Sequence, residues 1–561
     1  MEVETMSDML TAVAIIFIVA GPFLLVANRF GIPPAPLLIL AGIVAGGYID
    51  EALAIELAQY GIALLVFFFG VGIQLSAIEP VITDSEIAAG GQIVVLGLLG
   101  AAFGLVVGLA PGEAFFVGVA TALSSTLVGV ALLQVEIRRN LIHGRLAQSI
   151  QFIQDLVAVA VLLALGAEAF TADAMAMQVG YGAFLLVAAF LFNRYVFSTM
   201  GRLAGDSEEL MIVGVISMLV IFIGAAALAD VSIVVGAFFA GVAVRHDRAE
   251  YLSLFNGLES IKDFFVAIFF ATVGALIVIP FVEMGMVESI EKLLLAAGIV
   301  LLVVIVKPAI TIGILITRGY EARTATLTAM STDQVSEFSL IIAIQALLLE
   351  YLTQSVFDAI ILAAAITMIT STITQRYDEQ IYHVLANRGI ISGRHDKIEQ
   401  LSSVPPDISD HAIVVGYGRK GSRIVDRCEA VGHPYVVIEN DPALRETVRS
   451  ECEAYVFGDA MESFTWRKAN VDEARVIVSA TSSDAVTRRI LDLETDAHLV
   501  LRAEDEDRAL YLLEEGATYV TVPDLLAGEQ LVELVKRLLD GELTAAELRE
   551  NGLRSLKADR R

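Results

Sequence analysis

The stretch LAQSIQFIQDLVAVAVLLALG, residues 146–166, is long and apolar enough to cross a lipid bilayer as a single helix. Asp155 lies in the middle of this stretch, and Gln154 precedes it. A carboxylate at that depth costs roughly 2.5 to 3.5 kcal/mol on insertion scales, so we expect it to bind an ion, a proton or a buried partner. The alternative is a structural aspartate that is held by another helix.

Similar apolar segments recur through the first two thirds of the chain, and 56% of all residues are hydrophobic. This composition predicts a polytopic α-helical membrane domain with about thirteen spans. The spans are expected near residues 9–27, 34–49, 56–76, 87–109, 113–134, 147–168, 177–197, 209–228, 231–246, 258–279, 290–316, 323–349 and 355–376.

Composition changes sharply after the last span, where charged residues and short strand patterns begin. We therefore predict four parts of the chain. They are a transmembrane domain at 1–380, a linker at 381–409, a nucleotide-binding domain at 410–540 and a C-terminal tail at 541–561.

Charges between the spans predict the orientation of the chain. The acidic start MEVETMSDM lacks the basic region of a signal peptide, so the first span is expected to be retained. Arginines fall in nearly every second loop, whereas Lys292 is the one basic residue assigned to the intervening loops. The positive-inside rule then places the N-terminus outside the cell membrane and the C-terminal domain in the cytoplasm.

A net charge of −28 makes nucleic acid an improbable partner, because phosphates need a basic surface. Such an acidic surface is typical of a salt-adapted cytosol. The two cysteines, Cys428 and Cys452, have no metal-ligand spacing and are expected to be reduced thiols.

Two predicted spans contain matching polar runs, ATALSSTLVG at 120–129 and TAMSTDQVSEFS at 328–339. The matching positions are Ser124, Ser125 and Thr126 in the first run and Ser331, Thr332 and Asp333 in the second. The runs lie seven spans apart, an odd number, so they cross the membrane in opposite directions, as an inverted repeat requires. We expect two crossed broken helices beside Asp155. Alternatively, the hydroxyls bond back to their own helical turns.

Two further charged residues lie inside predicted spans. Lys307 is too deep to reach the interface easily, and we expect it to neutralise Asp155 or Glu337. Glu337 follows Asp333 by four residues and so shares its helical face. It is expected to line the ion path or to pair with Lys307.

The cytosolic part begins with HAIVVGYGRKGSRIVDRCEAVGHPYVVIENDP from residue 411, which reads as strand, GxGxxG turn, helix and strand. Repeated strand and helix units predict a Rossmann-like, doubly wound parallel sheet. The candidate cofactor residues are Gly416, Gly418, Arg419, Gly421, Glu439 and Asp459. An acid at 439 favours NAD(H) or an adenosine nucleotide such as AMP or ATP over NADP. The alternative is a dimerisation module with an empty crevice.

These residues carry a resemblance. FIQD at 152–155, ALSST at 122–126, Lys307 and VSEF at 335–338 resemble the Kef-type branch of the monovalent cation:proton antiporter superfamily. Residues 410–540 resemble the RCK or TrkA-N domain, including GDA at 458–460. The resemblance implies that cation and proton compete at Asp155, and that the protein is a homodimer, with an ancillary subunit or thiol metabolite as a further possible regulator.

The chain departs from that family at STDQVSEF, where relatives often have a Gly-Gln-Gly-Gly-Glu-Phe-like stretch. Asp333 is therefore unexpected, and ion choice and stoichiometry stay open.

Together these patterns predict a potassium:proton antiporter gated by a nucleotide-binding domain, and not an enzyme. A sodium:proton antiporter is the first alternative. An RCK-gated potassium channel fits poorly, because the chain has too many spans and no TVGYG filter. An oxidoreductase would need a substrate domain for which the chain has no room.

Overall fold

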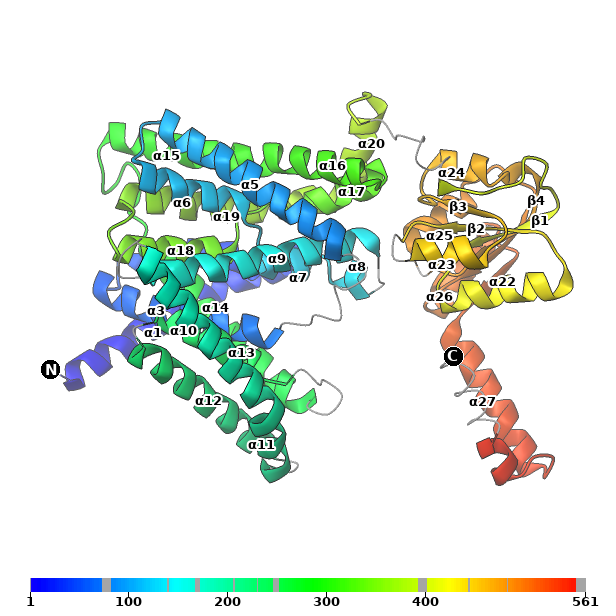
Figure 1. Ribbon diagram of the computed structural model, residues 1–561, viewed down its shortest axis with the longest axis horizontal. Coiled ribbons are helices and arrows are strands. Elements are labelled where there is room, and N and C mark those ends of the chain that lie inside the picture. Colours follow the sequence, from blue (N-terminus) through cyan, green and yellow to red (C-terminus); the bar gives the residue numbers. More distant parts are fainter. Residues whose placement is uncertain are drawn as a thin grey trace. The chain divides into compact units, whose positions relative to one another are not determined.

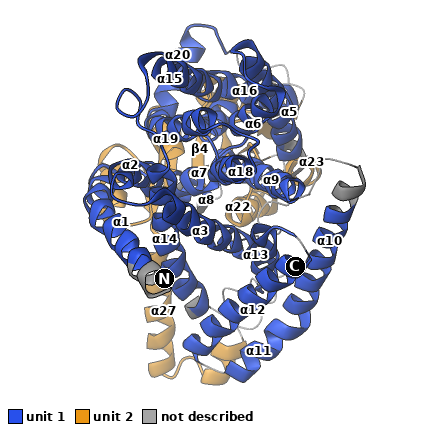
Figure 2. Ribbon diagram, turned by 90° about the vertical axis from the view of Figure 1, so that its left-hand side faces the viewer, with its two compact units in different colours: residues 1–393 blue, residues 394–561 orange. Residues whose placement is uncertain are grey.

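The computed structural model forms two compact units, residues 1–393 and 394–561, which Figure 2 colours separately. The structure describes residues 2–72, 82–138, 141–166, 172–204, 207–229, 231–245, 252–391, 401–441, 444–481 and 483–550.

The first unit is entirely helical in its described parts (Figure 1). Its helices are α1 (Glu2–Phe30), α2 (Pro34–Gly46), α3 (Glu51–Gly72), α5 (Ile82–Val106), α6 (Pro111–Ala122), α7 (Thr126–Leu132), α8 (Gln134–Arg138), α9 (Ile142–Leu165), α10 (Ala172–Leu191), α11 (Phe197–Ala204), α12 (Glu208–Leu228), α13 (Ile233–Val242), α14 (Leu252–Ala275), α15 (Met286–Leu301), α16 (Lys307–Arg318), α17 (Ala322–Met330), α18 (Glu337–Leu348), α19 (Gln354–Arg376) and α20 (Asp378–Asn387). Single π-helical segments, η2 (Phe192–Val196) and η3 (Leu302–Val306), join α10 to α11 and α15 to α16.

The polytopic helical fold is confirmed. Within the described residues, nine helical segments are long and apolar enough to span a membrane, and α2, α13 and α18 are shorter apolar helices. Each of the thirteen predicted spans coincides with a helix, a helix pair joined by a π-helical segment, or two half-helices separated by a break.

Packing divides these helices into two bundles (Figure 2). The panel consists of α1, α2, α3, α12, α13 and α14. The core bundle consists of α5, α6, α7, α9, α15, α16, α17, α18 and α19. The two meet where α2 contacts α19 and where α13 contacts α9.

Glycines bring the panel helices into backbone contact. A Cβ atom on Gly42 would overlap the carbonyl oxygen of Ala271, and one on Gly274 would overlap that of Ile39. Small residues of this kind allow close helix approach where lipid provides no hydrophobic driving force. Helices α2 and α14 are therefore tightly joined.

Two helices of the core bundle are broken at the predicted places. Between α6 and α7 the chain is extended at Leu123 and Ser125, and Ser125 caps α7 by accepting a hydrogen bond from the Val128 amide at 3.2 Å. Between α17 and α18 the Ser336 hydroxyl similarly accepts from the Phe338 amide at 3.0 Å. Side-chain caps satisfy amides that a helix start leaves free.

A fully buried ion pair joins α15 to α19. Lys292 Nζ contacts Asp358 Oδ2 and donates to the Val278 carbonyl at 2.9 Å. Gln354 Nε2 donates to Asp358 Oδ1 at 2.8 Å and to the Leu276 carbonyl at 2.9 Å. Lys292 thus lies inside α15, and the prediction that placed it in a loop was wrong. The predicted span began at residue 290, whereas α15 begins at Met286, so Lys292 lies more than one turn inside the helix.

The second unit is a six-stranded parallel sheet in the order β3-β2-β1-β4-β5-β6, which confirms the doubly wound fold. Its strands are β1 (His411–Val415), β2 (Tyr435–Glu439), β3 (Tyr455–Phe457), β4 (Ala474–Ser479), β5 (His498–Arg502) and β6 (Tyr519–Thr521). Its helices are α22 (Arg419–Val431), α23 (Arg445–Glu451), α24 (Ser463–Lys468), α25 (Asp484–Leu491), α26 (Glu506–Glu514) and α27 (Pro523–Leu539). The strand order reverses between β1 and β4, where such folds bind ligands.

The predicted linker at 381–409 is too long at both ends. Helix α20 and Ile391 belong to the first unit, because Tyr382 and Ile391 are buried there. At the other end, Ser403 pairs with Tyr455 at the edge of the sheet. Between these ends, residues 392–400 lie outside the described part of the chain.

Candidate functional site

The two breaks of the core bundle contact each other directly. The Ser124 hydroxyl donates to the Thr332 carbonyl at 3.0 Å, and Gln334 Nε2 donates to the Ser125 carbonyl at 3.1 Å. All four residues are buried. We call this meeting of residues 123–126 and 331–337 the crossing. It brings together the two polar runs that the sequence pattern had paired.

Glutamine amides hold the crossing in place. Gln154 Oε1 accepts from the Ser124 amide at 2.9 Å, and Gln154 Nε2 donates to Gln92 Oε1 at 2.5 Å. Gln151 Nε2 donates to the Ser331 carbonyl at 2.9 Å. The sequence analysis had identified Gln154 only. Gln92 and Gln151 each lie in an apolar helix, and that shared feature is the signal that could have found them.

Asp155 is fully buried, and neither of its carboxylate oxygens accepts a hydrogen bond from any described residue. Glu337 is close enough to interact with it electrostatically, and the Thr126 hydroxyl is near enough to stabilise its charge, although that hydroxyl donates its hydrogen bond to Glu337 Oε1. A buried polar group without a partner is costly, so its presence points to a ligand. Asp155, which lies beside the crossing, therefore has less complete hydrogen bonding than the carboxylates of Asp333 and Glu337.

Glu337 is the first residue of α18, and its carboxylate accepts hydrogen bonds from the first turn of α7. Its Oε1 accepts from the Thr126 hydroxyl at 2.6 Å and from the Leu127 amide at 3.1 Å. Its Oε2 is buried without a partner in the described chain. A carboxylate suits this place, because free amides carry positive partial charge.

Lys307 has different partners from those predicted. Its fully buried ammonium donates to the carbonyls of Leu123 at 2.8 Å and Gln334 at 3.3 Å. Within the described chain it forms no ion pair with Asp155 or Glu337, so the predicted pairing with either carboxylate was wrong. The physical reason is that helix α6 ends at Ala122, and the free carbonyls beyond this end carry negative partial charge.

Asp333 lies in the second break and is also fully buried. Its Oδ2 accepts from the Thr374 hydroxyl at 2.6 Å, and its Oδ1 has no hydrogen-bond partner among the residues that the structure covers. Lys307 is the cation with which it interacts. Lys307 therefore lies on the Asp333 side of the crossing, while Glu337 faces Asp155.

The hydroxyls of Ser331 and Thr332 point back to their own helix. Ser331 Oγ donates to the Leu327 carbonyl at 2.8 Å and Thr332 Oγ1 to the Ala329 carbonyl at 3.1 Å. The alternative that the hydroxyls bond back to their own helical turns is therefore correct for Ser331 and Thr332. Their backbone carbonyls, by contrast, accept hydrogen bonds from Gln151 and Ser124 and so form part of the crossing.

Taken together, the residues at and beside the crossing bring buried carboxylate, hydroxyl and carbonyl oxygens into the core bundle. Four carboxylate oxygens there lack partners among the described residues, and they belong to Asp155, Asp333 and Glu337. A proton or a dehydrated monovalent cation would satisfy such oxygens.

The backbone of the Gly-rich turn in the second unit requires two of its glycines. Gly416 has a φ of +93°, which a side chain would disfavour, and a Cβ on Gly421 would overlap the Gly416 carbonyl oxygen. A Cβ on Gly418 would enter open space. Arg419 begins α22 with an exposed side chain. The turn thus leaves room for phosphate at the helix start.

Glu439 ends β2 and is largely buried against this turn. Its Oε2 accepts from the Tyr417 amide at 2.7 Å, and its Oε1 accepts from the amides of Asn440 and Asp441, each at 2.8 Å. Burial raises the pKa of Glu439, and these amide hydrogen bonds oppose the rise. The carboxylate thus fixes the Gly-rich turn, a role beyond the cofactor selectivity that the sequence suggested for it.

Asp459, the last of the predicted cofactor residues, follows β3 and is buried. Its Oδ1 accepts from the Met461 amide at 2.9 Å. It therefore shapes the turn after β3 at the same edge of the sheet.

Comparison with protein families gives two matches. The profile of the sodium/hydrogen exchanger transmembrane family matches residues 13–376, and that of the TrkA-N domain matches residues 412–523. The first covers the panel and the core bundle, and the second covers the parallel sheet.

Several curated proteins are similar along most of the chain. The putative cation/proton antiporter YbaL of Escherichia coli K12 is 27% identical over 547 residues, which span 92% of this chain and 96% of YbaL. The putative K(+) efflux antiporter KefB of Alkalimonas amylolytica is 24% identical, over 91% of this chain and 79% of KefB. The glutathione-regulated potassium-efflux system protein KefC of Salmonella newport is 25% identical, over 91% and 82%.

Among solved structures, the sodium proton antiporter MjNhaP1 of Methanocaldococcus jannaschii aligns with a TM-score of 0.52 at 16% identity. The alignment covers 67% of this chain and 99% of MjNhaP1. At this identity the likeness concerns the fold of the membrane unit.

Proposed function

The chain belongs to the sodium/hydrogen exchanger family and carries a TrkA-N domain, and from this premise we propose that it is a potassium:proton antiporter in which Asp155 binds proton and cation in turn. One observation carries the proposal: both carboxylate oxygens of the fully buried Asp155 lack a partner in the described chain. Membership of an exchanger family also argues against the channel alternative.

Exchange follows from competition at one carboxylate. An ionised, buried Asp155 is stabilised either by a proton or by a cation, and one occupant excludes the other. Thr126 and Glu337 supply further oxygens beside it. Movement of the core bundle against the panel would then expose the occupied site alternately to the two sides.

We propose potassium as the transported cation because two of the relatives that match over most of the chain are named for potassium efflux. A sodium:proton antiporter is the alternative, since carboxylate and carbonyl oxygens bind either ion. MjNhaP1, which is named as a sodium antiporter, shares the fold and does not decide the cation.

The experiment is flux in proteoliposomes that contain the full chain, driven by a pH gradient, with potassium and sodium compared at several pH values. Proton movement coupled to potassium and lost in Asp155→Asn supports the proposal. Coupling to sodium alone selects the alternative, and exchange that persists in Asp155→Asn contradicts the role of Asp155.

For the second unit we propose that an adenine nucleotide, NAD(H) or AMP-like, binds at Gly416, Gly418 and Gly421 and regulates exchange. Lys420 lies near Arg419 and Arg502, so three cations surround the start of α22 in a strongly acidic protein. This local positive charge favours a phosphate-bearing ligand. The ligand can regulate only if it prefers one state of the transporter.

Substitution of Gly418 tests this regulation. Gly418→Asp places a carboxylate in the open space beside the turn, so we expect calorimetry on the full chain to show loss of NAD(H) and AMP binding. Potassium exchange itself should persist. NADP serves as the ligand control, because Glu439 is expected to disfavour its 2′-phosphate. Absence of any adenine nucleotide binding to the unmodified chain would favour the empty dimerisation module.

We also propose a homodimer in the cell membrane, with the N-terminus outside and the second unit in the cytoplasm. Helix α27 supports the dimer, because none of its residues is buried and most of its apolar side chains are exposed. These include Leu531, Val532, Val535 and Leu539. Crosslinking of the full chain in membranes tests the oligomeric state, and protease access to sealed vesicles tests the orientation.

A further inference from the structure

We propose that the contact between Arg323 and Glu379 is a positioning pair, through which α20 fixes the half-helix α17 and thereby the carbonyls of Ser331 and Thr332 at the crossing. The pair lies outside the candidate ion site, at the opposite end of α17. The inference rests on the proposed transport at the crossing.

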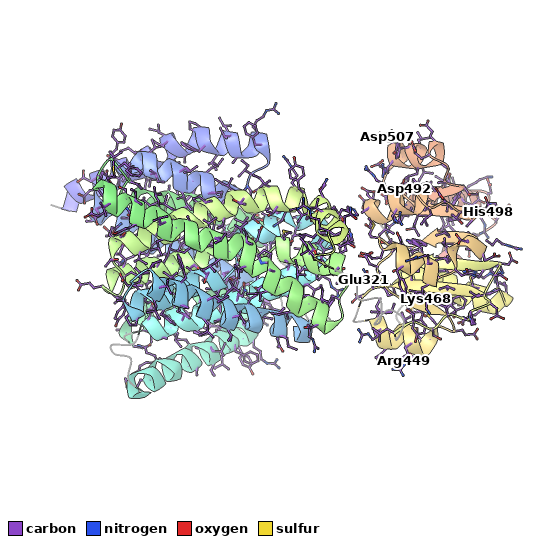
Figure 3. All side chains as sticks on the ribbon, turned by 90° about the horizontal axis from the view of Figure 1, so that it is seen from above. Glu321, Arg449, Lys468, Asp492, His498 and Asp507 are labelled. Carbon is purple, nitrogen blue, oxygen red and sulfur yellow. The ribbon has the colours of Figure 1, made fainter. Side chains whose placement is uncertain are left out.

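Arg323 and Glu379 form a two-point contact. Arg323 Nε donates to Glu379 Oε2 at 3.1 Å, and Arg323 Nη2 donates to Glu379 Oε1. The Arg323 side chain is 11% exposed and that of Glu379 is 32% exposed. A bidentate pair that is largely shielded from water fixes direction as well as distance. Glu321, the residue just before α17, lies at this end of the first unit (Figure 3).

Apolar packing holds α20 against the same end of α17 (Figure 1). Tyr382 and Ile391 are buried in one cluster with residues of α17 and α16. The α17 and α16 members of this cluster are Ala322, Ala325, Leu327, Ala329, Ile312 and Leu315. Helix α20 is therefore docked on the core bundle by apolar contacts, and the ion pair fixes its register.

Helix α17 is suited to transmit a displacement. All nine of its residues are buried, and the hydroxyls of Thr326 and Thr328 donate to the carbonyls four residues before them, at 2.7 and 2.8 Å. At 1.5 Å per residue its length is about 13 Å. A short, fully packed helix of this kind moves as one piece, so a shift at Arg323 reaches Ser331.

The far end of α17 is bonded into the crossing. Gln151 donates to the Ser331 carbonyl at 2.9 Å, and Ser124 donates to the Thr332 carbonyl at 3.0 Å. A displacement of α17 would change both hydrogen bonds and the position of the break that follows. The orientation of the oxygens around Asp155 is thus sensitive to the docking of α20.

Helix α20 also faces the other broken helix. Asp378, at its start, interacts electrostatically with Arg323 of α17 and with Glu136 of α8, the helix that follows α7. The start of α17 and helix α8, which follows α7, therefore both lie near the start of α20. Among the described elements, α20 is the last helix of the first unit before the chain continues to the second.

The test uses the full chain in proteoliposomes, with Glu379→Gln, Arg323→Gln and the charge-swapped Arg323→Glu/Glu379→Arg. We expect each single variant to raise the KM for potassium about fivefold with a smaller change in the maximal rate, because the site is misaligned rather than removed. The swapped variant should restore KM. A matched control is Asp410→Asn, which breaks the exposed Arg475–Asp410 pair of the second unit and should leave KM unchanged.

Single variants that transport with the KM of the unmodified chain would overturn the proposal. So would a swapped variant that folds but keeps the altered KM of the single variants. If the Gln variants do not fold, Arg323→Lys replaces them, because it keeps the charge and loses the two-point geometry. This variant should also raise the KM for potassium. An unchanged KM would overturn the proposal. Failure of the unmodified chain to exchange any cation would refute the proposed function instead, which keeps the two results distinct.

Discussion

Two buried charge centres of the membrane unit differ in how completely their polar atoms are bonded. At Lys292 and Asp358 both carboxylate oxygens accept hydrogen bonds, one from Lys292 and one from Gln354. At Asp155 neither oxygen does so within the described chain. Both aspartates are 0% exposed. Burial of a charge therefore does not by itself distinguish the two centres, whereas the hydrogen bonding of their carboxylate oxygens does.

The two centres also differ in backbone structure. Asp358 lies in the unbroken helix α19 and anchors the turn after α14 through Lys292 and Gln354. Asp155 lies beside two broken helices, whose free amides and carbonyls are compensated by Glu337 and Lys307. The first centre joins elements together, and the second leaves carboxylate oxygens without a hydrogen-bond partner in the described chain. The following substitutions test that distinction.

The largest effect is expected for Asp155→Asn. An amide cannot exchange a proton, so pH-driven potassium flux should fall below detection, by more than about a hundredfold. Thermal unfolding in detergent should be unchanged or shifted upward, because a neutral amide is cheaper to bury than an unpartnered carboxylate. A strongly destabilised variant would show that Asp155 is a structural residue like Asp358.

Next in size is the effect of Asp358→Asn, which leaves the Lys292 ammonium buried without its countercharge. We expect a loss of about 3 to 5 kcal/mol of stability, measured by unfolding in detergent. The folded fraction should still exchange potassium. The double variant Lys292→Met/Asp358→Leu should recover much of the stability, since replacing a buried ion pair by apolar side chains is often neutral. Loss of exchange in that stable double variant would move this centre into the transport mechanism.

A smaller effect separates two substitutions of Lys307. Lys307→Gln keeps N–H donors for the carbonyls of Leu123 and Gln334, whereas Lys307→Met leaves them unsatisfied. We expect Lys307→Met to be less stable than Lys307→Gln by about 1 to 3 kcal/mol. Equal stability of the two variants would mean that the ammonium matters through its charge alone, as the sequence had suggested.

The smallest effect concerns Asp378, a half-buried carboxyl outside the spans. Burial raises its pKa to about 6; the nearby Glu379 and Glu136 carboxylates add to the rise, and Arg323 opposes it. Because this pKa lies above that of an unfolded aspartate, about 3.9, the docking of α20 is most stable below about pH 4 and weakens as pH rises through about 6. After screening by solvent we expect no more than about 1 kcal/mol.

Hydrogen exchange of residues 378–391, corrected for its intrinsic pH dependence, measures that change. Asp378→Asn should keep α20 equally protected between pH 5 and pH 7. A protection that falls with pH in this variant as in the unmodified chain would assign the change to another group.

The sequence predicted the crossing because its two halves leave the same local signal, a run of small hydroxyl residues inside an apolar span. It identified Asp155 as a candidate site residue because ionisable residues are rare inside membrane spans. The parallel sheet was equally accessible, since Gly416, Gly418 and Gly421 stand between a strand and a helix.

Other features depend on partners that are distant in the sequence. Lys307 was expected to pair with a carboxylate, but it binds the Leu123 carbonyl, which is free because α6 ends just before it. No local sequence pattern around Lys307 predicts the end of another helix. Lys292 was placed in a loop because it lies near the start of a span and its partner Asp358 is 66 residues away. Helix α20 was assigned to a linker, because a helix of ten residues, half of them polar, carries little signal for docking.

The glutamines around the crossing have one further consequence. Gln92, Gln151, Gln154 and Gln334 carry amides that keep the same charge throughout the range of pH in which proteins fold. The hydrogen-bonded scaffold of the crossing is thus indifferent to acidity. We therefore expect each inflection in a titration of transport to come from a carboxyl group, the lysine or a group beyond the crossing. Replacing Gln154 by glutamate would make the scaffold itself a proton sensor and should add an inflection to the pH profile.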